Sequence, residues 1–520
     1  MTAASGVAQA QASDPASGVD DGPTLRHADI HRRPDAAHKR AVVNAFRAFL
    51  PAHCLLYVDE DTRPYECDGL TAYRQTPLCV VLPENEEQVR RTLVTCRELD
   101  VPVVARGAGT CLSGGATPHA SGVLLALAKF NRILRIDPVA RIAVVQPGVR
   151  NVTVSEVAAP YGLFFAPDPA SQLAATIGGN VAENAGGVHC LKYGLTAQNV
   201  MAIRAITIEG EIVELGSSAL DAPGYDLTAL INGSEGMLAI ATEVTLKLLP
   251  RPTLARVILA TFDAVETAGN AVAAVIAAGI IPAALEMMDQ ATTRAVEAFV
   301  HAGYDLEAKA VLLCESDGTP EEVDEEIARM TEVLRAAGAS GIRVSGSDAE
   351  RARLWAGRKA ALGTIGRLSP DYYVLDGSVP RRRIADVLRF IAEQEKKHGL
   401  RCLNMFHAGD GNLHPVILFN ASDPAELHRT EEFSDAVLRK CVELGGTVTG
   451  EHGVGVEKLG AMCAQFSPGE LGTFFGVKRA FDPVGLLNPG KAVPTLARCA
   501  EFGRMHVRHG QLPFPELERF

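Results

Sequence analysis

The sequence predicts an α+β protein of several domains. Three observations lead to this prediction: the chain has 520 residues, a strand–helix–strand alternation covers residues 78–107, and near residue 255 the pattern changes to helices alternating with strands. Single hydrophobic cores rarely grow beyond about 250–300 residues. We therefore expect roughly three domain-sized units.

The first elements follow from hydrophobic periodicity. Residues 38–50 carry apolar side chains at helical spacing and predict an N-terminal helix. LCVVLP (78–83) predicts a strand, residues 84–100 an amphipathic helix with acidic residues in its first turn, and VPVVARG (101–107) a second strand. This is a βαβ unit, and the loop after it lies at the carboxyl end of a strand, where open sheets bind ligands.

The remaining pattern separates two further regions. A second run of strands and turns is predicted over residues 122–137, 141–149, 176–187, 200–215 and 238–250. Helices alternate with strands from about 255 to 450, which predicts a separate α+β domain, and residues 450–494 read as loop and helix.

Composition excludes several classes of protein. Hydrophobic residues (47%) and charged residues (22%) occur at the levels of soluble globular proteins, and a net charge of −12 without a basic run argues against a nucleic-acid partner. The 11 cysteines include no CxxC pair, which argues against a disulfide framework and against iron–sulfur ligation. The first 24 residues predict a disordered tail without a signal peptide, and the most apolar run (271–285) is too short to cross a bilayer. We therefore expect a cytoplasmic protein.

Two glycine-rich loops suggest a large cofactor. In the first, Leu112 stands where a Rossmann fingerprint needs its third glycine and a strand follows instead of a helix, so an NAD site is not expected. Its backbone N–H groups still suit a pyrophosphate, although a flexible loop explains it equally well. The second loop (167–187) would let backbone approach a flat ring system, although two tight turns would also explain it. Together they fit an extended cofactor such as FAD.

The stretch MFHAGDGNLHP (405–415) predicts a β-hairpin. If Asp410 and Gly411 form a two-residue turn, His407 lies opposite His414 with Cβ atoms roughly 5 Å apart. That spacing lets two imidazoles share a metal ion. A pair of hydrogen-bonded histidines beside a turn is the alternative.

Several strings resemble a known superfamily. PVVARGAGTCLSGG, DPASQLAATIGGNVAENAGG, GSEGMLAIATEVTLKLLP and LLNPGK resemble the FAD-binding domain of the vanillyl-alcohol oxidase and p-cresol methylhydroxylase (PCMH) superfamily. HAGDGNLHP with TGEHGVG resembles its metal-dependent 2-hydroxyacid dehydrogenase branch. RPYECDGL, residues 354–382 and residues 498–520 resemble the FAD subunit of bacterial glycolate oxidase most closely.

The resemblance implies a fold and domain boundaries. It implies a PCMH-type FAD-binding domain of two α/β subdomains with a ferredoxin-like α+β cap for the substrate. The expected boundaries are a tail at 1–37, an N-terminal helical segment at 38–74, the FAD-binding domain at 75–252, the cap at 253–450, a C-terminal segment returning to the FAD site at 451–497, and an extension at 498–520.

The resemblance also implies cofactor-binding residues. The pyrophosphate would be bound by Arg106, Gly107, Gly109, Thr110 and Gly114. Along the ribityl chain and the flavin ring would lie Ser171, Thr176, Gly179, Asn180 and Gly186. Ile240 would lie near the adenine, and Asn488 would close the site. Some relatives tether FAD through a histidine where this chain has Thr110, so we expect non-covalent FAD.

The remaining implied residues concern chemistry. His407, His414 and Glu451 match the ligands of a divalent metal, with Zn²⁺ and Mn²⁺ as the expected ions. His452 matches the general base that takes the hydroxyl proton. Arg358 matches an arginine that grips the substrate carboxylate, and a surface salt bridge is an equally open alternative.

Two departures from the family pattern bear on the substrate. Val374 and Leu362 stand where the hydroxyglutarate enzyme has a lysine and a threonine, so a second carboxylate would lack a partner. A small 2-hydroxyacid such as glycolate or D-lactate is expected. The expected role is the catalytic subunit of a glycolate oxidase complex, with iron–sulfur and second FAD-domain subunits as partners and membrane contact only through them.

Other functions remain open at this point. They are a non-catalytic FAD-binding scaffold subunit, a D-lactate or other D-2-hydroxyacid dehydrogenase acting alone, and an O₂-using alcohol oxidase without metal.

Overall fold

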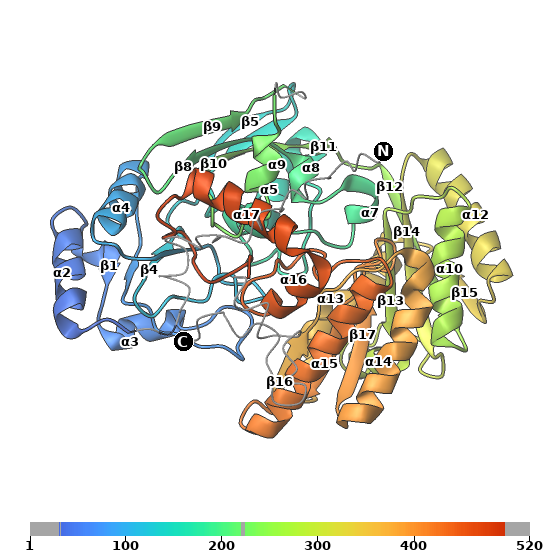
Figure 1. The fold of residues 1–520 in the computed structure, drawn as a ribbon. Coiled ribbons are helices and arrows are strands. Elements are labelled where there is room, and N and C mark those ends of the chain that lie inside the picture. The colour runs from blue at the N-terminus through green and yellow to red at the C-terminus, as the bar shows by residue number, and fades with distance from the viewer. Residues whose placement is uncertain (1–30, 32, 220–223, 495–520) are drawn as a thin grey trace, which may run out of the picture.

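The computed structural model describes residues 31, 33–219 and 224–494. Most of the tail predicted for residues 1–37 and all of the extension predicted for 498–520 lie outside the described residues. Two sheets built from the N-terminal half stand on one side of Figure 1 and a seven-stranded sheet on the other, while the C-terminal helices cross back toward the N-terminal half.

The first sheet contains the predicted βαβ unit in an expanded form. Its strand order is β1-β2-β4-β3, and β2 and β3 each pair in parallel with β4, which lies between them. The crossover helix α4 starts at the N-cap Asn85, whose side chain accepts a hydrogen bond from the backbone N–H of Gln88. The bounds are β1 (Leu55–Leu56), β2 (Cys79–Val81), β3 (Val103–Arg106) and β4 (Val123–Ala126), with α2 (Ala36–Arg47), α3 (Asp59–Thr62) and α4 (Glu86–Glu98).

The second sheet is antiparallel, with the order β5-β6-β10-β8-β9. Along β10 buried and half-buried residues alternate, as expected for a strand with one face in a core. Its strands are β5 (Ile133–Asp137), β6 (Ile142–Val145), β8 (Val200–Ile206), β9 (Ile212–Gly216) and β10 (Ile240–Lys247), β7 (Leu163–Phe164) pairs with β11 (Leu249–Pro250), and the helices are α5 (Asn151–Ala158), α6 (Ile177–Glu183), α7 (Cys190–Tyr193), α8 (Thr196–Asn199) and α9 (Leu227–Ile231).

One predicted element is wrong. Residues 176–187, assigned to the run of strands and turns, contain the helix α6. Thr176 caps it, because its Oγ1 accepts a hydrogen bond from the backbone N–H of Gly179 (3.4 Å). The two glycines lower helix propensity, which is why the sequence pattern misses it.

The seven-stranded sheet consists of two halves with related topology. Its order is β15-β12-β14-β13-β17-β18-β16. The first half, β12-α10-β13-α11-β14-α12-β15, has the strand order of a ferredoxin-like unit, with α11 inserted between its second and third strands. The second half, β16-α14-β17-β18-α15, repeats that strand order without the last strand. The halves meet where β13 pairs with β17. Strand bounds are β12 (Leu254–Phe262), β13 (Ala284–Asp289), β14 (Ala310–Gly318), β15 (Gly341–Val344), β16 (Asp371–Val374), β17 (Arg401–Phe406) and β18 (Pro415–Phe419).

Helices cover both faces of this sheet (Figure 1). One face packs on α10 (Val265–Ala277), α12 (Pro320–Ala336), α14 (Ile384–His398) and α15 (Pro424–Glu443). The other packs on α11 (Gln290–Val300) and α13 (Asp348–Ile365), and Leu112 and Val188 of the N-terminal half join that core. The α11/α13 face is therefore the one that meets the glycine-rich loops.

The C-terminal segment returns to the first sheet. After α16 (Leu459–Gln465) and α17 (Pro468–Phe481), Leu487 forms a parallel bridge with Val103, and both are fully buried. The fully buried Lys478 in α17 donates to the carbonyls of Met237 and Leu487 (both 2.7 Å). Among the described residues, no helix combines the length and the apolar character needed to cross a membrane.

Candidate active site

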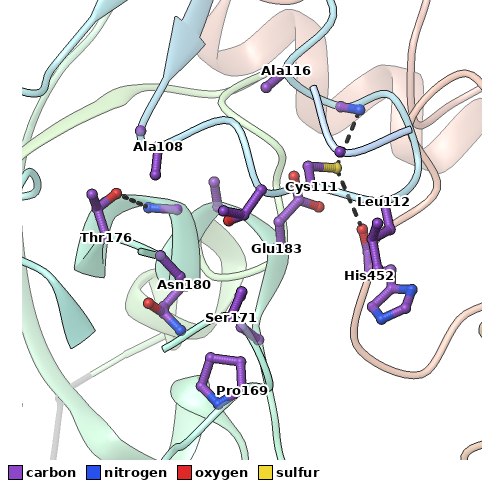
Figure 2. A pocket seen from close by; sticks show the side chains of 18 of the residues that line it. Ala108, Cys111, Leu112, Ala116, Pro169, Ser171, Thr176, Asn180, Glu183 and His452 are labelled. Atoms are coloured by element: carbon purple, nitrogen blue, oxygen red, sulfur yellow. Dashed lines mark hydrogen bonds between the residues drawn. The ribbon is translucent and has the colours of Figure 1, made fainter. Parts of the chain in front are cut away.

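A cavity of about 440 Å³ lies where the two glycine-rich loops meet the α11/α13 face of the large sheet. Figure 2 shows its inner part, with Ser171, Thr176 and Asn180 on one side, Cys111 and His452 on the other, and Glu183 between them. The first glycine-rich loop, the second glycine-rich loop and the C-terminal segment therefore contribute residues to the same cavity.

The walls of this cavity fit FAD. Both glycine-rich loops line it with small residues, such as Gly107, Gly109 and Gly179. Gly107 also lets the two loops pack closely, because a Cβ there would collide with Thr176 Oγ1. Asn180 lies on the wall and is 1% exposed, yet neither amide atom has a hydrogen-bond partner among the described residues. A buried amide without a partner is costly, so it points to a polar ligand. Walls made of small residues, together with the unpartnered amide of Asn180, suit a large flat cofactor.

The twelve residues expected to bind FAD fall into two groups. Those on the cavity wall are Arg106, Gly107, Gly109, Thr110, Ser171, Thr176, Gly179, Asn180 and Ile240. Gly114, Gly186 and Asn488 lie behind it. Asn488 supports the wall, since its Nδ2 donates to the carbonyls of Gly115 (3.0 Å) and Glu235 (2.7 Å), which do line the cavity.

The hairpin that carries the two histidines differs from the prediction. Asn404 lies opposite Pro415 and His407 opposite Asn412, so residues 408–411 form a four-residue turn and the predicted two-residue turn is wrong. The neighbouring strand explains the wider turn, because the backbone N–H of Gly409 donates to the carbonyl of Leu285 (2.9 Å).

The two histidines nevertheless share a face. The observed register places His414 opposite Met405, two residues before His407. A shift of two residues preserves the side of a strand, whereas a shift of one reverses it. The rings lie 5.0 Å apart between centroids, on the α11/α13 face.

Glu451 completes a set of three possible metal ligands. Its Oε1 lies 3.2 Å from His407 Nε2 and 3.0 Å from His414 Nε2. The Nδ1 atoms are directed elsewhere, toward Glu286 Oε1 (2.7 Å) and the carbonyl oxygen of Leu375 (3.1 Å). With Nδ1–H donated in this way, both Nε2 atoms face one point beside a carboxylate, which fits a divalent cation.

Asp376 organises the segment that carries Glu451. It accepts hydrogen bonds from the backbone N–H groups of residues 450, 451 and 452 (3.0, 3.1 and 2.9 Å) and from Asn412 Nδ2 (2.9 Å). Lys458 Nζ donates to it from 2.9 Å, and both side chains are fully buried. Burial raises the pKa of Asp376, but the positive charge of Lys458 outweighs this and holds the pKa below its usual range. One carboxylate thus ties the hairpin to the loop of the third ligand.

His452 has the properties of a base. Its ring stacks on His414 with centroids 4.8 Å apart, and its buried Nδ1 has no hydrogen-bond partner among the described residues. Burial lowers the pKa of His452 to about 4, although the carboxylate of Asp376 opposes this shift. The imidazole is therefore neutral near pH 7 and able to accept a proton.

Arg358 enters the cavity from α13. It is 6% exposed, so the salt bridge that it forms is buried in the cavity wall and does not lie on the surface. Its Nε and Nη2 lie 2.8 and 2.7 Å from Glu286 Oε2. Val374 and Leu362 line the same cavity with apolar side chains. Among the described residues on this wall, Arg358 and Arg106 are the permanently cationic side chains.

Sequence reasoning missed Glu286, Asp376 and Lys458. Glu286 had a detectable signal, because it stands in the otherwise apolar strand ALEMMD and few glutamates are buried without a partner. Asp376 and Lys458 gave none, since their pairing depends on segments 82 residues apart.

Known families match most of the chain. Residues 77–216 match a family described as FAD binding domain, and residues 251–492 match one described as FAD linked oxidases, C-terminal domain. The glycolate oxidase subunit GlcD of Escherichia coli (strain K12) is 58% identical over 482 residues, covering 93% of this chain and 97% of that protein. The D-lactate dehydrogenase of Anaerostipes hadrus is 34% identical over 463 residues, covering 86% and 96%.

Solved structures agree on the fold. The 4-ethylphenol oxidase of Gulosibacter chungangensis has a TM-score of 0.75 at 17% identity, covering 90% of this chain and 100% of the other. The p-cresol methylhydroxylase also scores 0.75, at 16% identity, covering 89% and 98%. These matches confirm the predicted PCMH-type fold and, with the family models, the prediction of an enzyme that binds FAD. The chain therefore belongs to the FAD-linked oxidase family that includes glycolate oxidase subunits and D-lactate dehydrogenases.

Proposed function

We propose that this protein oxidises a small 2-hydroxyacid, glycolate or D-lactate, to the 2-oxoacid with FAD and a divalent metal ion, Zn²⁺ or Mn²⁺. The observation that carries the proposal is the position of His407, His414 and Glu451 on the wall of the same cavity as the FAD loops, with His452 and Arg358 beside them. A non-catalytic scaffold would need none of these five side chains.

The reaction removes a proton from the hydroxyl group and a hydride from the α-carbon. FAD, when bound, would supply a hydride acceptor at N5, and a cation held by His407, His414 and Glu451 would supply a Lewis acid. The neutral imidazole of His452, on the cavity wall, takes the hydroxyl proton, and the nearby carboxylate of Asp376 stabilises the imidazolium that forms. The electron pair of the C–H bond leaves with the hydride, and the substrate becomes the 2-oxoacid.

The cavity wall supports the proposed substrate preference. Glu286 occupies Nε and Nη2 of Arg358, and the remaining Nη1 is a cationic donor that suits an oxygen of the substrate carboxylate. The apolar Val374 and Leu362 offer nothing to a second carboxylate, and burying one without a partner would be costly. This favours monoacids over 2-hydroxyglutarate.

The proposal extends to cofactor attachment and partners. Since Thr110 stands where some relatives have a tethering histidine, we propose that FAD is bound non-covalently. The similarity to GlcD, named as a glycolate oxidase subunit, supports a role as the catalytic subunit of such a complex. Electrons would then pass to an iron–sulfur subunit, a second FAD-domain subunit would complete the complex, and the protein would be cytoplasmic with membrane contact through these partners.

A D-2-hydroxyacid dehydrogenase that works without partners is the second candidate. The similarity to the D-lactate dehydrogenase of Anaerostipes hadrus supports it. Reduction of an artificial dye by the purified single chain at the same rate as by the co-purified complex would favour this candidate.

The substrate is tested by anaerobic flavin reduction. Glycolate or D-lactate should bleach the visible flavin absorption of purified protein within seconds, and D-2-hydroxyglutarate should do so at least tenfold more slowly. Reduction by 2-hydroxyglutarate alone would refute the substrate assignment.

The metal and the base are tested in the same assay. Removal of metal by a chelator should abolish reduction, and Zn²⁺ or Mn²⁺ should restore it. His452→Ala should keep FAD and lose reduction by about 10²–10⁴-fold. The matched control is His428→Ala, because the His428 side chain is 72% exposed. Full reduction in metal-free protein would instead favour an oxidase without metal.

A further inference from the structure

Glu286 is a buried carboxylate whose two oxygens serve different partners. It lies in β13 at the junction of the two halves of the large sheet, and its side chain is 1% exposed. Oε1 lies 2.7 Å from Nδ1 of His407, and Oε2 lies 2.8 and 2.7 Å from Nε and Nη2 of Arg358. One side chain therefore joins a proposed metal ligand to the proposed substrate-binding arginine.

The strand register makes this geometry rigid. β13 pairs with β17 as Met287 opposite Phe406, so Glu286 projects next to His407 on the α11/α13 face. Glu286 lies inside β13, where it also pairs with Leu313 of β14, and His407 directly follows β17. Arg358 comes from α13, which packs on the same face. A side chain on a sheet holds its partners more accurately than one on a loop.

We propose that Glu286 is a positioning residue that holds His407 for the metal and Arg358 for the substrate carboxylate at the same time. This inference rests on the proposed function. The Oε1 contact accepts Nδ1–H of His407, which keeps the imidazole in the tautomer whose Nε2 faces the cation. The Oε2 contact occupies two nitrogens of Arg358 and leaves Nη1, which has no hydrogen bond to described residues, for a ligand.

The bland alternative is that Glu286 only neutralises a buried arginine. The two roles give different results when Glu286 is replaced by glutamine. A glutamine that accepts from one partner must present its NH₂ group to the other, so one of the two contacts is lost. A positioning role predicts weaker metal binding even where stability is preserved, whereas a neutralising role predicts a change in stability alone.

The experiment measures Zn²⁺ affinity of the FAD-loaded protein by competition with a chelating dye, together with kcat, KM and the melting temperature. For Glu286→Gln we expect Zn²⁺ binding about 10- to 100-fold weaker and a raised KM for glycolate or D-lactate. The matched control is Glu315→Gln, because Glu315 lies on the neighbouring strand β14, is equally buried and pairs with an arginine, but does not contact His407. The control should lose stability and keep the parent Zn²⁺ affinity.

A double variant separates folding from positioning. Glu286→Gln with Arg358→Met removes the cation that would be left without its partner, so it should recover stability while Zn²⁺ binding stays at least tenfold weak. If the single variant does not fold, the Zn²⁺ affinity is measured on this double variant instead. Zn²⁺ affinity within threefold of the parent in either variant would overturn the positioning role.

The result also distinguishes this inference from the proposed function. Binding of Zn²⁺ by the parent, its loss in His414→Ala, and unchanged binding in Glu286→Gln would overturn only the role of Glu286. Failure of the parent to bind Zn²⁺ more tightly than His414→Ala would overturn both.

Discussion

Lys458 and Asp376 form a buried ion pair, and replacing Lys458 by methionine tests how far it determines the stability of the site. Lys458 Nζ donates to Asp376 (2.9 Å), to the carbonyl of Gly453 (2.8 Å) and to Thr449 (3.3 Å), and its side chain has no exposed surface. Methionine keeps much of the aliphatic volume but removes the charge, so Asp376 would remain as a buried carboxylate without a counter-ion.

The expected loss of stability in Lys458→Met depends on the hydrogen bonds to Asp376 that remain. Removing one partner of a buried ion pair costs about 3–5 kcal/mol. Three backbone N–H groups, from residues 450 to 452, would still donate to Asp376. We therefore expect the lower end, a loss of about 3 kcal/mol in the free energy of unfolding. For a cooperative unit of about 150–250 residues this lowers the melting temperature by roughly 6–12 °C.

The assay is urea and thermal unfolding of the purified protein, with Lys440→Met as the control. Lys440 pairs with Glu443 on the surface, where the pair contributes little, so its replacement should change stability by less than about 1 kcal/mol. Adding Asp376→Asn to Lys458→Met should recover part of the loss, because both charges are then gone. A Lys458→Met protein within about 1 kcal/mol of the parent would refute the assignment of this pair as a stabilising contact of the site.

Two further predictions use contacts elsewhere. Gly107→Ala should reduce bound FAD at least tenfold, measured by flavin absorbance per protein, since its Cβ would collide with Thr176. Gly363→Ala should retain FAD, because a Cβ there would have no described atom within 4 Å beyond its own stretch of helix, and equal flavin content in the two variants would contradict this. Burial raises the pKa of Glu315, but hydrogen bonds from His189 and an arginine outweigh it and hold the pKa at about 2, below the unfolded value. The stabilisation from ionised Glu315 is complete above about pH 4.5 and is lost as the pH falls toward 2. In urea titrations the free energy of unfolding of the parent should therefore fall by roughly 2 kcal/mol more than that of Glu315→Gln by pH 3. If the two proteins lose stability in parallel, Glu315 does not stabilise the fold in this way.

Much of the site could be predicted because its residues lie in short continuous stretches whose local sequence pattern indicates their structure. The glycine loops, the alternation of the strands and the string HAGDGNLHP are continuous in the sequence, and strand periodicity puts His407 and His414 on one face even though the predicted register was off by two residues. The helix α6 was missed because glycine makes its propensity low and only tertiary packing, against Pro147, compensates.

The sequence by itself determined the fold class, the cofactor loops and the pair of histidines, since each depends on residues close together in the chain. The tertiary structure alone decided which charges meet. Glu286 reaches His407 across 121 positions, and Lys458 reaches Asp376 across 82. A buried charge is tolerated only when it is paired. Several carboxylates and cations of the chain could form such pairs. The partners observed here are selected by the packing of β13 against β17, for Glu286 and His407, and by the return of the C-terminal segment, for Lys458 and Asp376.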